Sequence, residues 1–256
     1  MEIIRSKANP AVKAISAYLA GQSREKWILV EGRKNVRDAL AQRITPIRIV
    51  ATPERAAELD EGLPLTVVSP EIYRGMKTVQ TPEGLLGVFE VTASTPDDIV
   101  GRPGAVLVLH GVQDPGNVGA VIRLAAAFGA AGVILGPGCA TPYNPKVSRG
   151  SAGAVLRTPF CLVPETVAAI RMLRERRKVV AAVAHGGADP GSGALQGDPV
   201  VLVGGEGSGL PEELALMAHS TVTIPTTGAV ESLNVAVAAG ILLYLSQRGS
   251  SRIAAP

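Results

Sequence analysis

Three polar clusters along the chain hold side chains that could carry out chemistry, and each follows an apolar run. The first extends from Leu109 to Arg123 and places Asn117 just after an Asp-Pro pair. We expect Asn117 to cap the helix that follows, because an amide can accept hydrogen bonds from the first backbone N–H groups. Arg123 lies inside that helix between Ile122 and Leu124, where an arginine needs an anion or another partner. The cluster therefore indicates a place where Arg123 meets an anion or another partner.

The second cluster is a loop with four glycines in six positions, Gly204 to Gly209, directly after the apolar run Val200–Val203. A plain turn would need fewer glycines, and glycine lets a ligand approach the backbone closely. Glu206 stands among them and is a strong acceptor for a hydroxyl or a cationic group. The loop is therefore typical of a ligand-binding segment.

The third cluster begins where a short β-like run ends at Ile224-Pro225. The chain then turns at Gly228 and enters a helix that we expect over Ser232–Gln247, with Ser232 and Asn234 in its first turn. Helix capping explains one polar side chain there but not two. We therefore expect the other to serve a functional site.

Common cofactor and metal signatures are missing from the sequence. No G-x-G-x-x-G follows a strand, and neither G-x-x-x-x-G-K-S/T nor G-x-S-x-G occurs. His110, His185 and His219 lack the spacing of metal ligands, so we expect no metal site. Cys139 and Cys161 are isolated, which excludes a disulfide framework and a four-ligand zinc site built on them. We expect both cysteines to be small buried hydrophobic residues in a reducing compartment.

A sheet must position the three clusters, because the apolar runs after residue 104 are continuous and β-branched, as in strands covered on both faces. The expected strands are Ala105–Leu109, Gly132–Leu135, Val179–Ala184, Val200–Val203 and Val222–Ile224. The expected helices are Val118–Phe128, Glu165–Arg177, Glu212–Ala218 and Ser232–Gln247. This pattern predicts a mainly parallel α/β sheet whose carboxyl ends place the clusters at one edge.

A second, smaller α/β domain is predicted over residues 1–95, with the sheet domain over residues 104–256. Proline, glycine and aspartate interrupt the apolar pattern between residues 93 and 103. The expected strands before this boundary are Trp27–Val30, Ile47–Ala51, Leu65–Val68 and Leu85–Val91. The expected helices are Pro10–Ala20, Arg33–Gln42, Pro53–Leu59 and Pro70–Met76.

Composition and charge narrow the class of protein. With 46% hydrophobic and 18% charged residues in 256, the chain is not of the disordered type. It has neither a membrane-spanning stretch nor an apolar signal segment, and we expect a cytoplasmic protein. Residues 1–48 hold ten basic and four acidic side chains, although the net charge of the whole chain is only +3. This local excess could bind a polyanion, and it could equally be a set of solvated helix faces.

The three clusters, taken in order, resemble the motifs of a known enzyme family. D-P-G-N-V-G with a later arginine and F-G (Asp114 to Gly129), G-G-E-G-S-G-L (Gly204 to Leu210) and I-P…E-S-L-N-V-A-V-A (Ile224 to Ala238) are similar to those of the SpoU, or TrmH, family of the SPOUT superfamily. Members are S-adenosylmethionine-dependent RNA ribose 2′-O-methyltransferases. The resemblance covers residues 104–248, with Pro225-Thr226 where many members have Pro-Met.

The first domain resembles the ribosomal-protein-like substrate-binding domain found in many members that modify ribosomal RNA. The similar stretches are S-K-A-N-P-A-V-K (Ser6 to Lys13), L-V-E-G (Leu29 to Gly32) and T-P-E-G (Thr81 to Gly84). Members that modify transfer RNA usually lack this domain. The resemblance therefore implies ribosomal RNA as substrate, most of all 23S ribosomal RNA; a transfer RNA enzyme and a catalytically inactive RNA-binding protein of the same fold are the alternatives.

The resemblance also implies a fold, a cofactor and an assembly. The fold is a deep trefoil knot in which the C-terminal helix passes through a loop, which the rules of chain connection would not predict. The cofactor is S-adenosylmethionine, the assembly is a homodimer, and neither a membrane nor a metal is implied. By position in the motifs, the catalytic set is Asn117, Arg123, Glu206, Ser232 and Asn234. The cofactor contacts would be Gly204, Gly205, Gly209, Ile224, Thr226 and Leu233.

Two roles follow for the charged residues. A guanidinium is too weak a base to deprotonate a hydroxyl, so we expect Arg123 to stabilise the charge that develops on the ribose oxygen or on a phosphate. The RNA itself would be held by the basic excess of the first domain. The candidates for this contact are Arg5, Lys7, Lys13, Arg33 and Lys34.

Overall fold

The computed structural model describes residues 2–22, 25–76 and 82–247, and the chain forms two compact units. The N-terminal unit comprises Met1–Thr92 together with Pro142–Leu156. The C-terminal unit comprises Ala93–Thr141 and Arg157–Pro256. The chain therefore passes between the units three times, whereas the sequence predicted one boundary and assigned residues 142–156 to the second domain.

The N-terminal unit is built on a four-stranded mixed sheet of order β1-β4-β2-β3. Its strands are β1 (Trp27–Glu31), β4 (Leu85–Glu90), β2 (Pro46–Ala51) and β3 (Leu65–Val67). β4 is antiparallel to both of its neighbours, and β2 and β3 are parallel. All four strands were predicted from their apolar runs.

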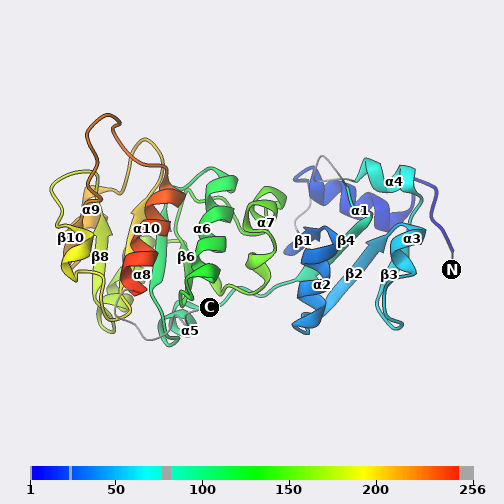
Figure 1. The fold of residues 1–256 in the computed structure, drawn as a ribbon, viewed down its shortest axis with the longest axis horizontal. Helices are drawn as coiled ribbons and strands as arrows, with labels where there is room; N and C mark the ends of the chain where they lie inside the picture. Colours follow the sequence, from blue (N-terminus) through cyan, green and yellow to red (C-terminus); the bar gives the residue numbers. More distant parts are fainter. Residues whose placement is uncertain (1, 23–24, 77–81, 248–256) are drawn as a thin grey trace. The chain divides into compact units, whose positions relative to one another are not determined.

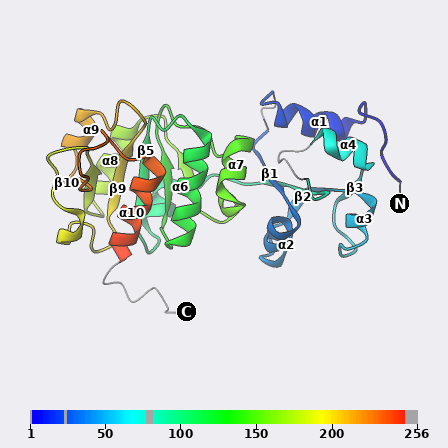
Figure 2. The same ribbon diagram turned by 45° about the horizontal axis from the view of Figure 1, so that its top comes forward.

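Four helices cover the two faces of this sheet, as Figures 1 and 2 show. They are α1 (Pro10–Leu19), α2 (Arg33–Ala41), α3 (Pro53–Ala56) and α4 (Pro70–Gly75). Ile15 of α1 and Ile72 of α4 share one buried cluster with Val88 of β4. Val36 of α2 and Ala56 of α3 share another on the opposite face. The alternation of side chains along each strand sends successive residues to these two cores.

The C-terminal unit contains a six-stranded sheet of order β10-β8-β9-β5-β6-β7. Every pairing in it is parallel. The strands are β5 (Val106–His110), β6 (Gly132–Leu135), β7 (Phe160–Leu162), β8 (Val179–Ala182), β9 (Val200–Gly204) and β10 (Ser220–Val222). The predicted parallel sheet is therefore confirmed, and its central strands β5 and β9 are adjacent although 94 residues separate their starts.

Helices cover both faces of the parallel sheet. One face packs against α5 (Pro96–Val100), α8 (Thr166–Arg174) and α9 (Glu212–Leu216). Beside the other lie α6 (Pro115–Ala127) and α10 (Val235–Gln247), which pack against each other. Figures 1 and 2 show α10 and α6 next to one another. This arrangement brings the start of α10 to the start of α6.

The structure corrects several local predictions. α10 begins at Val235, three residues later than predicted, and β10 ends at Val222, where the predicted strand began. α5 lies inside the stretch that was expected to be a linker, because Thr95 and Asp98 form a capping box around Pro96. The strand β7 and the helix α7 (Pro145–Ser151) were not predicted, because neither is long enough to show a hydrophobic period.

The described residues also bear on the expectations about membrane spans, metal ligands and the two cysteines. No helix among them is long and apolar enough to cross a membrane. No group of three or more His, Cys, Asp or Glu side chains in these ranges could hold a metal ion. Cys161 is buried, which raises the pKa of its thiol to about 11, and Cys139 is half-buried with a raised thiol pKa for the same reason.

Arg177 fastens the edge of the parallel sheet opposite the polar clusters. Its guanidinium donates hydrogen bonds to the carbonyl oxygens of Val100 at 2.6 Å, Gly104 at 2.5 Å and Asp198 at 3.2 Å, and also to that of Arg102. These carbonyls lie at the end of α5 and before β5 and β9. One planar cation thus ties the segment of residues 100–104 to Asp198, which is far from it in sequence.

We predict that Arg177→Ala lowers the free energy of unfolding of the C-terminal unit by roughly 2–4 kcal/mol, because several charge-assisted hydrogen bonds to part-buried carbonyls are lost. Urea denaturation followed by circular dichroism measures this. The matched control is Arg176→Ala, which removes an exposed ion pair with Asp97 and should cost less than about 1 kcal/mol. Equal losses in the two variants would contradict the role of Arg177.

Candidate active site

The polar clusters meet at the carboxyl edge of the parallel sheet. β5 and β9 are neighbours in register, with His110 opposite Gly204. The loop after β5 and the glycine loop after β9 therefore leave the sheet side by side. Open α/β sheets bind their ligands at this edge.

Asp114, not Asn117, caps α6, which corrects the prediction. The Asp114 carboxylate accepts hydrogen bonds from the backbone N–H groups of Gly116 at 2.6 Å and Asn117 at 3.0 Å. Pro115 occupies the first helical position, where proline is favoured, and this Asp-Pro pair was the sequence signal for the true cap. The side chain of Asn117 is consequently free to bond elsewhere.

Asn234 caps α10 and also reaches Asn117. Its Oδ1 accepts hydrogen bonds from the backbone N–H groups of Ala236 at 2.9 Å and Val237 at 3.3 Å. Its Nδ2 donates to Oδ1 of Asn117 at 3.0 Å. Both ends of this one amide are thus used, and they join the start of α10 to the start of α6.

Asn117 completes the connection by donating from its Nδ2 to the carboxylate of Glu206 in the glycine loop. We refer to Asn117, Glu206 and Asn234 as the polar triad. The direction of its hydrogen bonds is fixed at both ends, since an ionised carboxylate only accepts and the N–H groups of α10 only donate. The partially positive end of α10 is therefore linked through two amides to a negative charge.

The glycine loop is held in one shape by close backbone packing. A Cβ at Gly204 would lie 2.1 Å from the backbone of Gly209 and Leu210, and one at Gly205 would lie 2.0 Å from the carbonyl oxygen of Gly111. The N–H of Gly209 donates to the carbonyl of Gly205 at 3.1 Å, which closes the loop around Glu206. The first two glycines therefore serve the packing of the protein itself.

A third loop supports the first two. The N–H of Gly111 donates to the carbonyl of Pro137 at 3.0 Å, and the N–H of Ala140 donates to the carbonyl of Val112 at 2.9 Å. Residues 136–141 thus hold Gly111, which in turn abuts Gly205. Sequence analysis did not single out this loop, because its contribution is made by backbone groups.

The nearby histidine has a structural role. Nδ1 of His110 is 2.9 Å from Oγ1 of the buried Thr166, which fixes its ring between the end of β5 and the start of α8.

Two of the predicted catalytic residues are not joined to the polar triad. Arg123 is exposed on α6, and being six residues after Asn117 it lies about 9 Å further along the helix and roughly 240° around it. Ser232 is exposed three residues before α10 begins. Within residues 2–22, 25–76 and 82–247, neither side chain has a recorded hydrogen bond or ion pair.

The predicted cofactor residues lie next to Glu206 or before Asn234 in the sequence, and they differ in exposure. Ile224 and Leu233 are half-buried, and Thr226 is exposed in a segment without helix or strand. In the glycine loop, a Cβ at Gly207 or Gly209 would meet no atom within 4 Å, so the outer side of the loop is open. Apolar surface beside open, glycine-lined backbone fits a nucleoside-containing cofactor.

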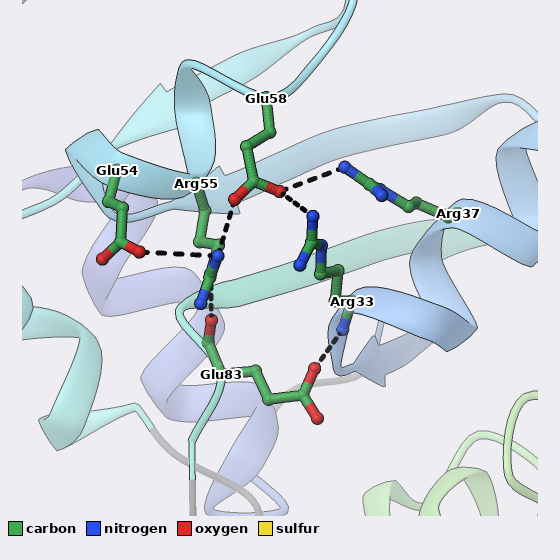
Figure 3. Close-up of polar contacts among 6 residues, drawn as sticks. All are labelled: Arg33, Arg37, Glu54, Arg55, Glu58 and Glu83. Carbon is green, nitrogen blue, oxygen red and sulfur yellow. Dashed lines mark hydrogen bonds and ion pairs between the residues drawn. The ribbon is translucent and has the colours of Figure 1, made fainter.

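The five predicted RNA-binding residues are all exposed, but one of them is already paired. The guanidinium of Arg33 is 2.9 Å from the carboxylate of Glu58, which also binds Arg37 at 3.0 Å and Arg55 at 2.6 Å. Figure 3 shows these three contacts. The hydrogen bond from Arg55 holds the pKa of Glu58 below its usual range. For Arg5, Lys7, Lys13 and Lys34, no ion pair is recorded with any residue that the structure describes.

Two motifs of the N-terminal unit meet at the start of α2. Gly32, at the end of L-V-E-G, precedes α2 and has no side chain to cap it. Glu83 of T-P-E-G supplies the cap, because its carboxylate accepts the N–H of Arg33 at 2.6 Å, as drawn in Figure 3. The carbonyl of Glu83 accepts from Arg55 at 3.0 Å. Thr81 of the same motif lies outside the described residues.

Comparison with known proteins gives matches to both units. The sequence profile of the SpoU rRNA Methylase family matches residues 104–244. The 23S rRNA (guanosine(2553)-2′-O)-methyltransferase RlmP of Bacillus subtilis is 30% identical over 250 residues, which cover 95% of this chain and 98% of RlmP. The crystal structure of an AdoMet-bound rRNA methyltransferase from Sinorhizobium meliloti has 33% identity and a TM-score of 0.86, covering 97% of this chain and 98% of that one. That of the SpoU methyltransferase AviRb from Streptomyces viridochromogenes has 26% identity and a TM-score of 0.82, covering 96% and 100%.

The packing of the glycine loop leads to a prediction about two of its glycines. Gly204→Ala should lower the thermal midpoint clearly and make the loop susceptible to proteases, because its Cβ would overlap backbone atoms that cannot move independently. Gly207→Ala is the matched control: its φ of +84° is unfavourable for alanine, but nothing obstructs the methyl group, so it should cost only about 1 kcal/mol. A Gly204→Ala variant as stable as Gly207→Ala would show that the loop is not closed as described.

Proposed function

The chain belongs to the SpoU rRNA Methylase family, and on this premise we propose that it transfers a methyl group from S-adenosylmethionine to a ribose 2′-hydroxyl of RNA. The observation that carries the proposal is the intact polar triad at the carboxyl edge of the sheet. The B. subtilis relative is named as a 2′-O-methyltransferase and the S. meliloti structure as AdoMet-bound. An RNA-binding protein without catalytic function would not require a hydrogen-bonded carboxylate at this place.

The RNA that we propose as substrate is 23S ribosomal RNA. The support is that RlmP, a 23S rRNA enzyme by name, matches this chain through the N-terminal unit as well as the C-terminal one. We propose that the N-terminal unit captures the RNA through Arg5, Lys7, Lys13 and Lys34, since these exposed charges have no recorded acidic partner in the described chain. Arg33 contributes less to RNA binding, because its positive charge is already paired with the carboxylate of Glu58.

We place the cofactor against the glycine loop and the segment from Ile224 to Leu233. When bound, S-adenosylmethionine supplies the electrophilic methyl group. The half-buried Ile224 and Leu233 offer it apolar surface, and Gly209 leaves the backbone accessible. Gly204 and Gly205 act indirectly by holding the loop in shape, because both face protein backbone.

The polar triad orients the acceptor hydroxyl in this proposal. Oε1 of Glu206 accepts the amide of Asn117, which leaves Oε2 to accept a hydrogen bond from the ribose hydroxyl. Holding that oxygen in line with the methyl group supplies much of the rate of a displacement reaction. Ser232, exposed near Asn234, would contact the ribose or the adjacent phosphate, and Arg123 would stabilise the developing negative charge.

We propose a homodimer formed through the exposed face of α6 and α10. Val237 is 51% exposed and Tyr244 48% exposed, and these residues lie two turns apart on one side of α10. Phe128, which follows α6, packs its ring 6.2 Å from that of Tyr244. Arg123 lies on the exposed side of α6, so a second copy docked here would bring its own Arg123 towards this face.

The proposal also includes the trefoil knot, in which the C-terminal helix passes through a loop, and a cytoplasmic location.

The test is transfer of labelled methyl from S-adenosylmethionine to an unmodified 23S ribosomal RNA transcript, followed by nuclease digestion and identification of the labelled nucleoside. A 2′-O-methylated nucleoside is the expected product. Label on a base, label only with transfer RNA, or no transfer to any RNA would overturn the assignment of reaction or substrate.

Arg123 provides a sharper prediction about mechanism. Arg123→Ala should lower the single-turnover rate of methylation by about 10² or more and change cofactor affinity little, because the charge it stabilises exists only in the transition state. Arg123→Lys should recover only part of the rate, since lysine lacks the planar fork of donors. A near-normal rate in Arg123→Ala would remove this residue from the catalytic set.

A further inference from the structure

The segment Pro142–Leu156 belongs to the N-terminal unit although it lies between two strands of the C-terminal sheet in sequence. The chain leaves β6, supports the active-site loops through residues 136–141, and then contributes α7 and the short 3₁₀ turn Ala154–Leu156 to the other unit. It returns at Arg157 to form β7. A segment that is continuous with the catalytic loops is therefore part of the unit proposed to capture RNA.

One side of α7 is firmly attached to β1. Val147 and Ser148 are buried, and the hydroxyl of Ser148 donates to the carbonyl oxygen of Leu29. The hydroxyl of Tyr18 in α1 donates to the carbonyl oxygen of Tyr143. These contacts fix the rotation of the helix and so determine which residues it exposes.

The opposite side of α7 carries two positive charges. Lys146 and Arg149 are exposed and lie three residues apart, so their side chains are neighbours on the helix. No acidic residue occurs between residues 142 and 156. Neither side chain has a recorded ion pair with another residue of the described chain. In contrast, Arg33, Arg37 and Arg55 share Glu58, and Arg176 has Asp97.

A third exposed basic side chain, that of Lys34 in α2, belongs to the same unit. The helix α7 is followed by Gly153, whose Cβ position would be 3.8 Å from Cβ of Asn35 in α2. Lys34 precedes Asn35 and is exposed, again without a recorded acidic partner in the part of the chain that the structure describes. Unpaired lysine and arginine side chains on a rigid helix are suited to bind phosphate groups.

We propose that Lys146 and Arg149 of α7 form a phosphate-binding surface for the backbone of the RNA substrate. This inference deepens the proposed function and rests on it. RNA is favoured over an acidic peptide because the two exposed side chains offer positive charge, which gains affinity for a phosphate backbone by releasing its condensed counterions. Since α7 continues directly from the loop at residues 136–141, phosphate contacts here are made by the same segment that supports Gly111.

The experiment compares the double variant Lys146→Gln/Arg149→Gln with a matched control, Arg171→Gln/Arg174→Gln. The control pair is also basic, exposed and three residues apart, but it lies on α8 of the C-terminal unit. The full chain binds an unmodified 23S ribosomal RNA transcript and, separately, polyglutamate across a series of salt concentrations. Cofactor affinity and the thermal midpoint are measured for each protein.

We expect the α7 variant to bind the transcript more weakly and to lose about 1.4–1.8 units of slope in a plot of log affinity against log salt, which corresponds to two phosphate contacts. The control should keep the normal slope, and both variants should retain the cofactor affinity and thermal midpoint. The single variant Arg149→Lys should keep most of the slope of the unaltered protein, because a point charge is sufficient for counterion release.

An α7 variant with the same RNA affinity and slope as the control would overturn the inference. So would loss of affinity for polyglutamate with no loss for RNA, which would identify an acidic protein as the partner instead. These readouts need no catalysis: failure of methyl transfer by the unaltered protein refutes the proposed function, while an unchanged salt slope refutes the role of α7.

Discussion

The hydrogen bonds of Asn117 hold the candidate active site together. Its amide accepts from Asn234, which caps α10, and donates to Glu206 in the glycine loop. Three segments that are about 90 and 30 residues apart in sequence are thus joined through one side chain whose orientation is fixed by its partners. Asp114 makes this possible by capping α6 itself, so that the amide of Asn117 is not needed for that purpose.

The glycine loop that carries Glu206 is itself fixed in position by backbone packing. An exposed carboxylate on a loose loop would sample many positions, and the entropy of fixing it would have to be offset on every binding event. Here the backbone of Gly205 packs against that of Gly111 so closely that no side chain fits between them. The loop at residues 136–141 supports Gly111 by hydrogen bonds, and α7 then carries the chain into the N-terminal unit. Cutting the protein near residue 100 would therefore separate α7 from the sheet that covers it.

The sequence predicted the parallel sheet and the family, because strands buried on both faces and ordered motifs are local signals. It also singled out Asn117, Glu206 and Asn234 as candidate site residues. It assigned the cap of α6 to Asn117 instead of Asp114, although the Asp-Pro pair at Asp114 contained that information. The contact between Asn117 and Asn234 could not be inferred from spacing, because it depends on how α6 packs against α10. The placement of α7 was missed for a related reason. The helix is too short to show a hydrophobic period, and its buried side is explained only by its packing against β1. Glu83 is a similar case, acting as the cap of a helix 50 residues earlier.

The most direct test of the central claim is the single-turnover methylation rate of Asn234→Asp, measured together with its thermal midpoint. Aspartate is as good a helix cap as asparagine, so the midpoint should stay close to that of the unaltered protein. It cannot donate to Asn117, and a carboxylate at this place would also oppose the charge of Glu206. We therefore predict a rate about 10² lower with α10 intact, because small misplacements of reacting groups have effects of this size. An Asn234→Asp variant that methylates RNA at the normal rate would contradict the account.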